Sequence, residues 1–300
     1  MPSVWLDGEL VSEDDARIDP RDGGFLHAAG VFTTMRASGG RVLMLDAHLA
    51  RLRRSCEALY VPLTYKDDEL SKAATSLLEA NGLSDARLRL TVTRGRTERD
   101  PLHGEVHRPT VLLTAGEMTP VPAEYRDKGM TAVLNSEHKL NPYDLQAGHK
   151  TLDYFGRFAA LRDAARRGAG ESLWFDVHNF LQCGSIANVF IVEQGTLVTP
   201  PTNGDLKDEA VKRSCPYPKS CVLPGTVRAW VMEQEGVRKV QRLPIDVNRL
   251  LAADEVFVTN SIMGVVPVTR LEQKAVADGQ PGPVTSNLMA RFAELIDGEL

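Results

Sequence analysis

The chain is 300 residues long, with 43% hydrophobic and 25% charged residues and a formal net charge of -5. This length and composition are typical of a globular protein with one large domain or two ordinary ones. The slightly acidic balance argues against nucleic acid or an anionic membrane as the main partner, because both attract basic surfaces. The apolar runs are far shorter than a membrane span, and the acidic N-terminal stretch lacks the pattern of a signal peptide. A cytoplasmic location is therefore expected.

The first part of the chain predicts strands with two helices between them, an α+β arrangement. A tight Asp7-Gly8 turn joins two short strands, and Asn81-Gly82 is expected to end the second helix. Residues 22–26 are expected to form a loop. The expected strands are residues 4–6, 9–11, 30–36, 41–45, 86–94 and 110–115, and the expected helices are residues 46–59 and 66–81. Asp46 is the expected N-cap of the first helix.

The second part begins after a proline-rich stretch at residues 118–123, which is the best candidate for a domain boundary. Residues 200–224 are long, irregular and rich in proline, a length typical of functional or mobile loops. The expected strands are residues 130–134, 173–175, 188–192, 196–199 and 256–259, and the expected helices are residues 151–167, 225–236 and 286–296. The helix at 151–167 is expected to bury Leu152, Phe155, Phe158, Ala159 and Leu161. We therefore predict a two-domain α/β (α+β) protein, with domains at 1–117 and 129–300 and a linker at 118–128.

The cysteine and histidine spacings do not indicate a metal site. Four cysteines are present, and none form a CxxC pair. A disulfide between Cys215 and Cys221 would be unusual in a cytosolic protein. His103 and His107 are four residues apart, but they lie in a segment rich in Pro, Gly and Arg instead of on a clear helix. No metal is predicted.

Three places are candidates for binding a phosphate group. Helix N-termini bind phosphate because their free N–H groups point outward. Residues 225–227 and 260–262 each follow a strand or loop in the way that a helix N-terminus does, although such junctions are common. Arg51, one turn into a helix, could bind a phosphate through two hydrogen bonds. The ordinary alternative for Arg51 is a solvated helix face, which its neighbours Arg53 and Arg54 favour.

Lys150 is the candidate for covalent chemistry. It is expected to open a helix, opposite a loop of small residues at 183–188. A lysine that forms a Schiff base must be partly desolvated, whereas most lysines at helix starts lie on the surface. The chain has no nucleophile elbow, P-loop or GxGxxG motif. Residue types alone therefore indicate a two-domain α/β protein with a candidate lysine-centred site.

The motifs, taken together and in order, resemble those of the fold-type IV (class IV) enzymes that use pyridoxal 5'-phosphate. This family includes branched-chain aminotransferase, D-amino acid aminotransferase and aminodeoxychorismate lyase. The resembling segments are residues 22–36, 48–52, 150–154, 188–192, 223–228 and 259–268. Each segment alone is weakly specific, but their order along nearly the whole chain is specific. The resemblance implies a fold of the D-amino acid aminotransferase type and a homodimer acting on small amino substrates.

The resemblance also implies roles for individual residues. Lys150 would hold the cofactor covalently and move the proton at the substrate Cα, and Tyr154 would lie near the cofactor's phenolic oxygen. The phosphate would be held by Arg51, the backbone N–H groups of Thr226 and Val227, and Ser261. The substrate side would be lined by Phe32, Thr34 and Asn260, of which Phe32 and Thr34 share one strand face. Arg99, with Arg94 and Arg96, is a candidate for binding substrate carboxylates, and the alternative is a solvated basic loop.

One position departs from the family pattern. The glutamate that pairs with the cofactor's pyridine nitrogen is replaced by Cys183, and a neutral thiol stabilises a protonated pyridine less than a carboxylate does. Three interpretations stay open: an impaired or non-catalytic homologue, chemistry such as β-elimination that needs a weaker electron sink, or a carboxylate supplied by Asp176 or Glu171. The opening segment departs as well, with His27 and Ala28-Ala29 in place of the usual residues.

The resemblance favours one member of the family. Thr33-Thr34 after Phe32, together with residues 259–264, is most similar to aminodeoxychorismate lyase. We therefore predict 4-amino-4-deoxychorismate lyase activity, in which pyruvate is eliminated and 4-aminobenzoate remains. The alternatives are a branched-chain or D-amino acid aminotransferase, and a catalytically impaired homologue that still binds pyridoxal 5'-phosphate.

Overall fold

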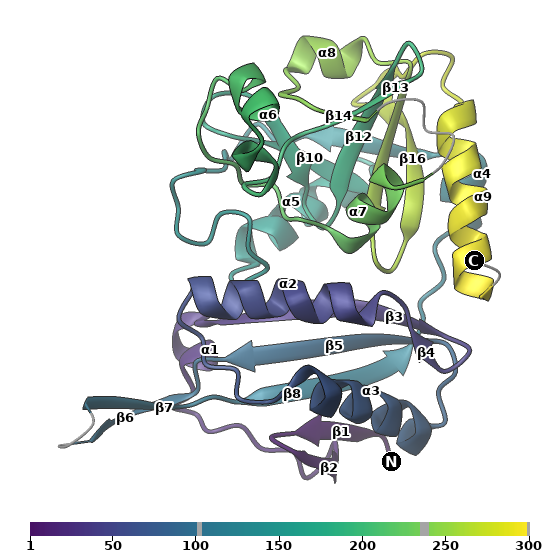
Figure 1. The fold of residues 1–300 in the computed structure, drawn as a ribbon. Helices are drawn as coiled ribbons and strands as arrows, with labels where there is room; N and C mark the ends of the chain where they lie inside the picture. The colour runs from purple at the N-terminus through teal and green to yellow at the C-terminus, as the bar shows by residue number, and fades with distance from the viewer. Residues whose placement is uncertain (101–103, 235–239, 299–300) are drawn as a thin grey trace. The chain divides into compact units, whose positions relative to one another are not determined.

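The computed structural model describes residues 1–100, 104–234 and 240–298. The chain folds into two compact units, each built from helices and a sheet (Figure 1). Unit 1 comprises Met1–Thr119 and His149–Asp153, and unit 2 comprises Pro120–Gly148 and Tyr154–Leu300. The short segment His149–Asp153, which the sequence assigned to the second domain, therefore belongs to the first unit.

Unit 1 is built on a six-stranded antiparallel sheet with the order β2-β1-β8-β5-β3-β4. Its strands are β1 (Ser3–Leu6), β2 (Glu9–Ser12), β3 (Gly30–Ser38), β4 (Arg41–Val42), β5 (Ala86–Thr93) and β8 (Val111–Glu117), and its helices are α1 (Gly23–His27), α2 (Leu45–Ala58) and α3 (Asp67–Asn81). A separate hairpin is formed by β6 (Arg96–Asp100) and β7 (Gly104–Arg108). Five predicted strands and the second helix are confirmed, because strand alternation and helix caps are local signals. The strand predicted at residues 41–45 is shorter, since β4 ends at Val42 and α2 begins at Leu45.

The sheet of unit 1 has one apolar face and one polar face. On β5, Leu88, Leu90 and Val92 point to the buried side, where α2 and α3 cover them. The alternate residues Arg87 and Arg89 point to the other side, opposite Arg36 and Thr34 of β3 respectively. The second face therefore collects arginines next to the strand that carries the predicted substrate residues.

Unit 2 is built on a mixed nine-stranded sheet with the order β11-β10-β9-β16-β15-β12-β13-β14, and β17 pairs with β16. Its strands are β9 (Met130–Leu134), β10 (Glu171–Phe175), β11 (Leu181–Gly184), β12 (Asn188–Glu193), β13 (Thr196–Thr199), β14 (Val240–Arg242), β15 (Glu255–Asn260), β16 (Gly264–Leu271) and β17 (Lys274–Ala275). Its helices are α4 (Ala123–Asp127), α5 (Phe155–Arg166), η1 (Asp205–Lys207), α6 (Glu209–Ser214), α7 (Thr226–Met232), α8 (Val247–Leu251) and α9 (Pro283–Asp297). The central strands β12 and β15 are buried nearly throughout, as their continuous apolar runs predict.

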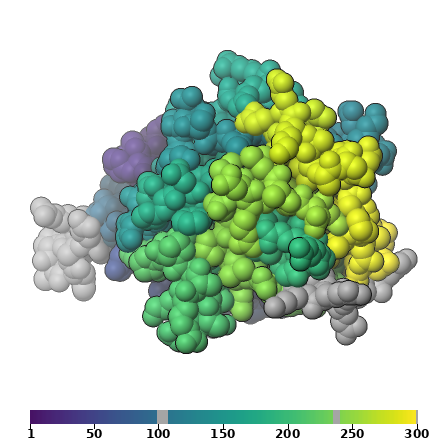
Figure 2. All heavy atoms as spheres, turned by 90° about the horizontal axis from the view of Figure 1, so that it is seen from above, coloured from purple at the N-terminus to yellow at the C-terminus, as the bar shows by residue number. Residues whose placement is uncertain are grey.

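The C-terminal helix α9 covers part of this sheet. Leu288 and Phe292 are buried against β15 and β16, and much of the helix remains on the surface, where Figure 2 shows it in yellow. Within the described residues, no helix is long and apolar enough to cross a membrane.

Several local predictions are wrong. Residues 22–26 were expected to form a loop, but Asp22 caps the short helix α1 through a hydrogen bond from Gly24 N (2.6 Å). The N-cap of α2 is Met44 in a left-handed conformation (φ 53°), and Asp46 lies in the first helical turn instead. The stretch at 200–224 contains η1 and α6, and Arg228 ties it down through a 2.8 Å ion pair to Asp205. It is thus an anchored segment instead of an irregular loop.

The helix after Lys150 also differs from its prediction. It begins at Phe155, because residues before it pair with β3. The predicted apolar face is wrong: Phe155 and Phe158 are 86% and 62% exposed, and Ala160 and Ala164 are buried instead. The helix turns its smallest side chains inward, and small side chains allow close packing against a sheet.

Candidate active site

Lys150 lies in an extended segment of unit 1 instead of at a helix start. Phe32 N donates to Lys150 O (2.9 Å), and Leu152 N donates to Gly30 O (3.0 Å), so the segment adds a short antiparallel bridge to β3. A side chain at Gly30 would approach Leu152 and Val92 O to 2.7 Å, which explains the glycine. The pairing holds the lysine backbone rigidly, as a covalent anchor for a ligand requires.

The side chains of Lys150 and Arg89 both contact the aromatic ring of Phe32. Lys150 Nζ lies 4.6 Å from the centroid of the Phe32 ring, and the guanidinium carbon of Arg89 lies 3.6 Å from the same centroid. Arg89 Nε also donates to Thr91 Oγ1 (3.1 Å), which orients the guanidinium. Both cations are half-buried. Sequence reasoning missed Arg89, although strand alternation and the pairing of Arg89 with Thr34 place it on this face.

A buried polar cluster lies under α2 in unit 1. Arg51 Nη2 donates to Thr33 Oγ1 (3.0 Å), and Thr33 Oγ1 lies 2.8 Å from His48 Nδ1. Arg51 is only 6% exposed, so the alternative of a solvated helix face is wrong. Burial, with the charges of Arg51 and Lys150, lowers the pKa of His48 to about 3. His48 is therefore neutral, and it leaves the positive charge of this cluster to Arg51.

In unit 2, Cys183 meets an arginine. Cys183 is a buried residue of β11, and its Sγ lies 3.7 Å from Arg157 Nη1. The same Nη1 donates to the backbone oxygens of Ser185 (2.9 Å) and Gly184 (3.2 Å). Sequence reasoning missed Arg157, because an arginine early in a helix resembles a surface residue. The residue that the resemblance places at the pyridine nitrogen thus lies beside a guanidinium.

Two carboxyl groups near Cys183 in sequence are held away from it by other contacts. Glu171 Oε1 accepts hydrogen bonds from Ser172 N (2.9 Å) and Ser185 N (2.8 Å), and the side chain packs against Gly184, where a Cβ would meet it at 2.7 Å. Burial raises the pKa of Glu171 to about 7.

Asp176 is bound just as firmly. It accepts hydrogen bonds from the backbone of His178 and Phe180 and from Gln182 Nε2, each at 2.9 Å. Asp176 shapes the β10–β11 turn, and Glu171 is bonded to the turn that follows β11. In this structure neither carboxyl group contacts Cys183 through a hydrogen bond.

The predicted phosphate residues of unit 2 converge. Thr226 Oγ1 at the start of α7 lies 3.2 Å from Ser261 Oγ, and Val227 is the second residue of this helix. Asn188 Nδ2 donates to Leu223 O (2.9 Å), and its Oδ1 would lie 2.0 Å from a Cβ at Gly225, so only glycine fits before the helix. Two hydroxyl groups beside backbone N–H groups are donors that suit an anion.

The sequence offered residues 260–262 as a candidate helix N-terminus, but the structure has a turn between two strands there. It joins β15 to β16, and Asn260 Oδ1 accepts hydrogen bonds from Ile262 N (3.0 Å) and Met263 N (2.7 Å). Asn260 thereby shapes the turn that presents Ser261. Tyr154 lies at the N-cap of α5, with its ring 5.8 Å from that of Phe158.

The predicted carboxylate-binding arginines have different surroundings. Arg96 forms ion pairs with Glu98 (3.1 Å) and Asp19 (3.6 Å) on the protein surface. Arg94 Nη2 lies 3.0 Å from His107 Nε2. Arg99 pairs with Glu105 in the β6–β7 hairpin, and its side chain, like His103, lies outside the described part of the structure. Arg89 is the described arginine beside Lys150.

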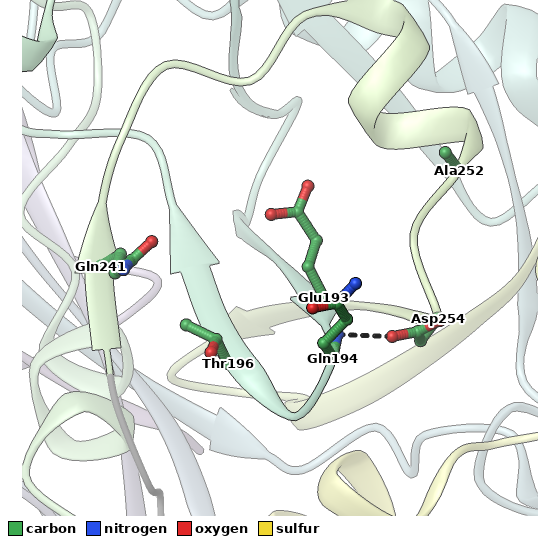
Figure 3. Close-up of a pocket in the computed structure, with 6 residues that line it drawn as sticks. All are labelled: Glu193, Gln194, Thr196, Gln241, Ala252 and Asp254. Atoms are coloured by element: carbon green, nitrogen blue, oxygen red, sulfur yellow. Dashed lines mark hydrogen bonds between the residues drawn. The ribbon is translucent and has the colours of Figure 1, made fainter.

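A surface hollow of about 470 Å³ lies elsewhere in unit 2, around the β12–β13 turn. Gln194 N donates to Asp254 Oδ2 (2.6 Å) at its floor, as the dashed line in Figure 3 shows. The lining residues are Glu193, Gln194, Thr196, Gln241, Ala252 and Asp254. None of them is a predicted site residue.

Metal and disulfide chemistry find no support in the described residues. No cluster of three or more His, Cys, Asp or Glu side chains there could hold a metal ion. All four cysteines are free, so the disulfide between Cys215 and Cys221 is not formed.

Each unit carries groups that suit part of a phosphate-bearing aldehyde. Unit 1 holds a lysine in a strand pairing and a buried arginine, and unit 2 holds a pair of converging hydroxyl groups. Two domains of mixed α/β content are the architecture of the pyridoxal-phosphate enzymes known as fold type IV.

The comparisons with known proteins agree with this class. The chain matches the family described as amino-transferase class IV over residues 30–271, and it belongs to that family. A putative branched-chain-amino-acid aminotransferase of Methanocaldococcus jannaschii is 30% identical over 97% of this chain and 96% of its own length.

Two solved structures show the same fold. The branched-chain amino acid aminotransferase of Escherichia coli has a TM-score of 0.87 at 24% identity, covering 99% of this chain and 95% of that one. The 4-amino-4-deoxychorismate lyase of Pseudomonas aeruginosa has a TM-score of 0.79 at 26% identity, covering 97% of this chain and 98% of that one. The chain is therefore an enzyme that depends on pyridoxal 5'-phosphate, either a lyase or an aminotransferase.

Proposed function

We propose that the enzyme is a 4-amino-4-deoxychorismate lyase, which splits its substrate into pyruvate and 4-aminobenzoate. The observation that carries this proposal is that, among the described residues, Cys183 contacts the guanidinium of Arg157 and no carboxylate, at the position where the family resemblance implies a glutamate. Pyridoxal 5'-phosphate, when bound, draws electrons from the substrate Cα into its ring. A ring without a carboxylate partner draws them less strongly. Elimination tolerates this loss better than transamination does, because the departing ether oxygen takes the electron pair and the product ring becomes aromatic.

The proposed roles follow the family resemblance. Lys150 holds the cofactor, removes the proton from the amino-bearing carbon and delivers a proton to the departing enolpyruvyl group as the ring C–O bond breaks. Tyr154 lies near the phenolic oxygen, and Cys183 lies near the pyridine nitrogen. The phosphate is held by Arg51, Thr226, Val227 and Ser261.

The substrate residues form the other part of the proposal. Phe32 and Thr34 line the substrate side, with Arg99 and Asn260. Arg89 is added because it shares the Phe32 ring with Lys150. A guanidinium in that place suits a substrate that carries a carboxylate, as 4-amino-4-deoxychorismate does. The proposal includes a homodimer and a cytoplasmic location.

The test supplies the cofactor-loaded enzyme with 4-amino-4-deoxychorismate and measures pyruvate and 4-aminobenzoate. Equal amounts of the two products, without a keto acid, would support the lyase. The same preparation is then offered branched-chain or D-amino acids with a keto acid. Amino transfer without pyruvate release would overturn the proposal.

A branched-chain aminotransferase is the second candidate. The 30% identity to the Methanocaldococcus jannaschii protein over almost the whole of both chains favours it. The same pair of assays separates the two candidates. Activity in neither assay, with the cofactor bound, would favour an impaired homologue.

A further inference from the structure

Arg157 is a cation with unused hydrogen-bond donors. Its Nη1 donates to Ser185 O and Gly184 O, and these two bonds fix the guanidinium over the end of β11. Within the described residues, Nε and Nη2 have no hydrogen-bond partner, and no carboxylate forms an ion pair with Arg157. A guanidinium has five N–H donors and no acceptor, so the remaining donors can serve a ligand.

The surroundings of Arg157 hold it in place without neutralising it. The rings of Tyr154 and Trp174 each lie 5.7 Å from the guanidinium carbon, and Cys183 Sγ lies 3.7 Å from Nη1. The nearby carboxyl of Glu171 already accepts from the turn on the other side of Gly184. Arg157 is half-buried, and removing a cation partly from water among such groups is costly unless something else binds it. A ligand acceptor would offset that cost.

We propose that Arg157 donates a hydrogen bond to the pyridine nitrogen of the cofactor and keeps the ring in its neutral, unprotonated form. The inference rests on the proposed placement of that nitrogen beside Cys183, and it holds for a lyase and an aminotransferase alike. A guanidinium stays protonated throughout the physiological pH range, so it can only donate, and the nitrogen must accept with its lone pair. A fixed positive charge also disfavours a second positive charge on the ring. A glutamate would instead accept a hydrogen bond from a protonated ring nitrogen and stabilise its positive charge.

The test compares cofactor analogues in the absence of substrate. One analogue carries C–H in place of the ring nitrogen and cannot accept a hydrogen bond. The other carries an N-methyl group and is permanently cationic. Dissociation constants are measured from tryptophan fluorescence and the visible absorption of the bound cofactor. Wild type is expected to bind pyridoxal 5'-phosphate at least about tenfold more tightly than either analogue, the size of one charged hydrogen bond.

Removing the guanidinium should remove this preference. In Arg157→Met, the dissociation constants of the natural cofactor and the C–H analogue are expected to lie within about threefold of each other. The matched control is Arg162→Met, at an exposed arginine of the same helix, and it should keep the wild-type preference. Arg157→Gln is a second variant, because it retains a neutral donor for the backbone oxygens. Circular dichroism shows which variants are folded.

Cys183→Glu separates this inference from the placement of the ring. If Arg157→Met abolishes the preference for the natural cofactor over the C–H analogue, and Cys183→Glu shifts the preference toward the N-methyl analogue, both the role of Arg157 and the placement are supported. If Cys183→Glu changes the ranking of the analogues but Arg157→Met and Arg157→Gln do not, the role of Arg157 is wrong and the placement stands. If none of these variants changes the ranking, both are wrong. Pyruvate release plays no part in these measurements, so the lyase proposal is judged separately.

Discussion

The polar clusters of the two units differ in how their cations are used. In unit 1, Arg51 is buried with Thr33 and His48. In unit 2, Arg157 lies beside Cys183, and its main bonds are to backbone oxygens. Following the family resemblance, we call the residues proposed to hold the cofactor's phosphate and aldehyde the retained part, and Cys183 with its neighbours, proposed beside the ring nitrogen, the changed part. Our proposals assign cofactor binding to the retained part and electron withdrawal to the changed part.

The largest expected effect is on Lys150, the centre of the retained part. Lys150→Ala should lower kcat by roughly 10³-fold or more, because both the covalent anchor and the proton carrier are lost. Borohydride reduction followed by mass spectrometry should fix the cofactor to wild type and not to the variant. Lys72→Ala, on the exposed side of α3, is the control and should behave as wild type. Covalent trapping of the cofactor in Lys150→Ala would show that another lysine is the anchor.

The second effect concerns Glu171 in the changed part. Its pKa is raised from 4.5 to about 7, so the folded state binds the proton more tightly than the unfolded state does. The contribution of Glu171 to stability is therefore fully present below pH 4.5 and is lost as the pH rises through about 7. Glu171→Gln imitates the protonated form and should lack this loss.

The measurement is urea unfolding of Glu171→Gln and wild type between pH 5 and pH 8. As the pH rises, the unfolding free energy of wild type should fall relative to that of Glu171→Gln, by about 3 kcal/mol at most. Glu272→Gln, at a half-exposed surface carboxylate, is the comparison variant. A difference that stays constant across this pH range would mean that Glu171 titrates normally.

The third effect returns to the retained part. Arg51→Met should weaken pyridoxal 5'-phosphate binding by about tenfold to a hundredfold, because a charged hydrogen bond to the phosphate is lost. Pyridoxal without the phosphate should bind both proteins nearly equally. Arg54→Met, on the exposed face of α2, should leave both affinities unchanged. An equal loss of affinity for pyridoxal would assign Arg51 a structural role instead.

The sequence predicted well what depends on neighbouring residues. Alternation along residues 86–94 predicted β5, and the Asn81-Gly82 pair predicted the end of α3, because period and caps are local signals. The motifs in order predicted the family, which the match over residues 30–271 confirms.

What depends on distant partners could not be predicted in this way. Lys150 was expected to start a helix, because the bridge from its segment to β3 joins residues more than a hundred positions apart. Arg157 and Arg89 were missed for the same reason: one is identified by the turn at Ser185 and the other by its ring contact with Phe32. Alone in the sequence, each is an ordinary arginine.

The smallest expected effect is on Cys183, the residue of the changed part that we place at the ring nitrogen. Cys183→Glu should raise amino transfer by about tenfold, because a carboxylate beside the pyridine nitrogen strengthens electron withdrawal. Arg157 should limit the gain, since a carboxylate there would form an ion pair with the guanidinium. Adding Arg157→Met should therefore increase the gain further.

Cys183→Ser is the matched control, because it keeps a small neutral group and should leave amino transfer near the wild-type rate. Both variants are assayed with a keto acid and an amino donor, and cofactor loading is checked by absorption. An unchanged rate in Cys183→Glu with full loading would count against placing Cys183 at the ring nitrogen. A gain confined to amino transfer, with pyruvate release unchanged or slower, would mean that the thiol at this position directs the enzyme toward elimination.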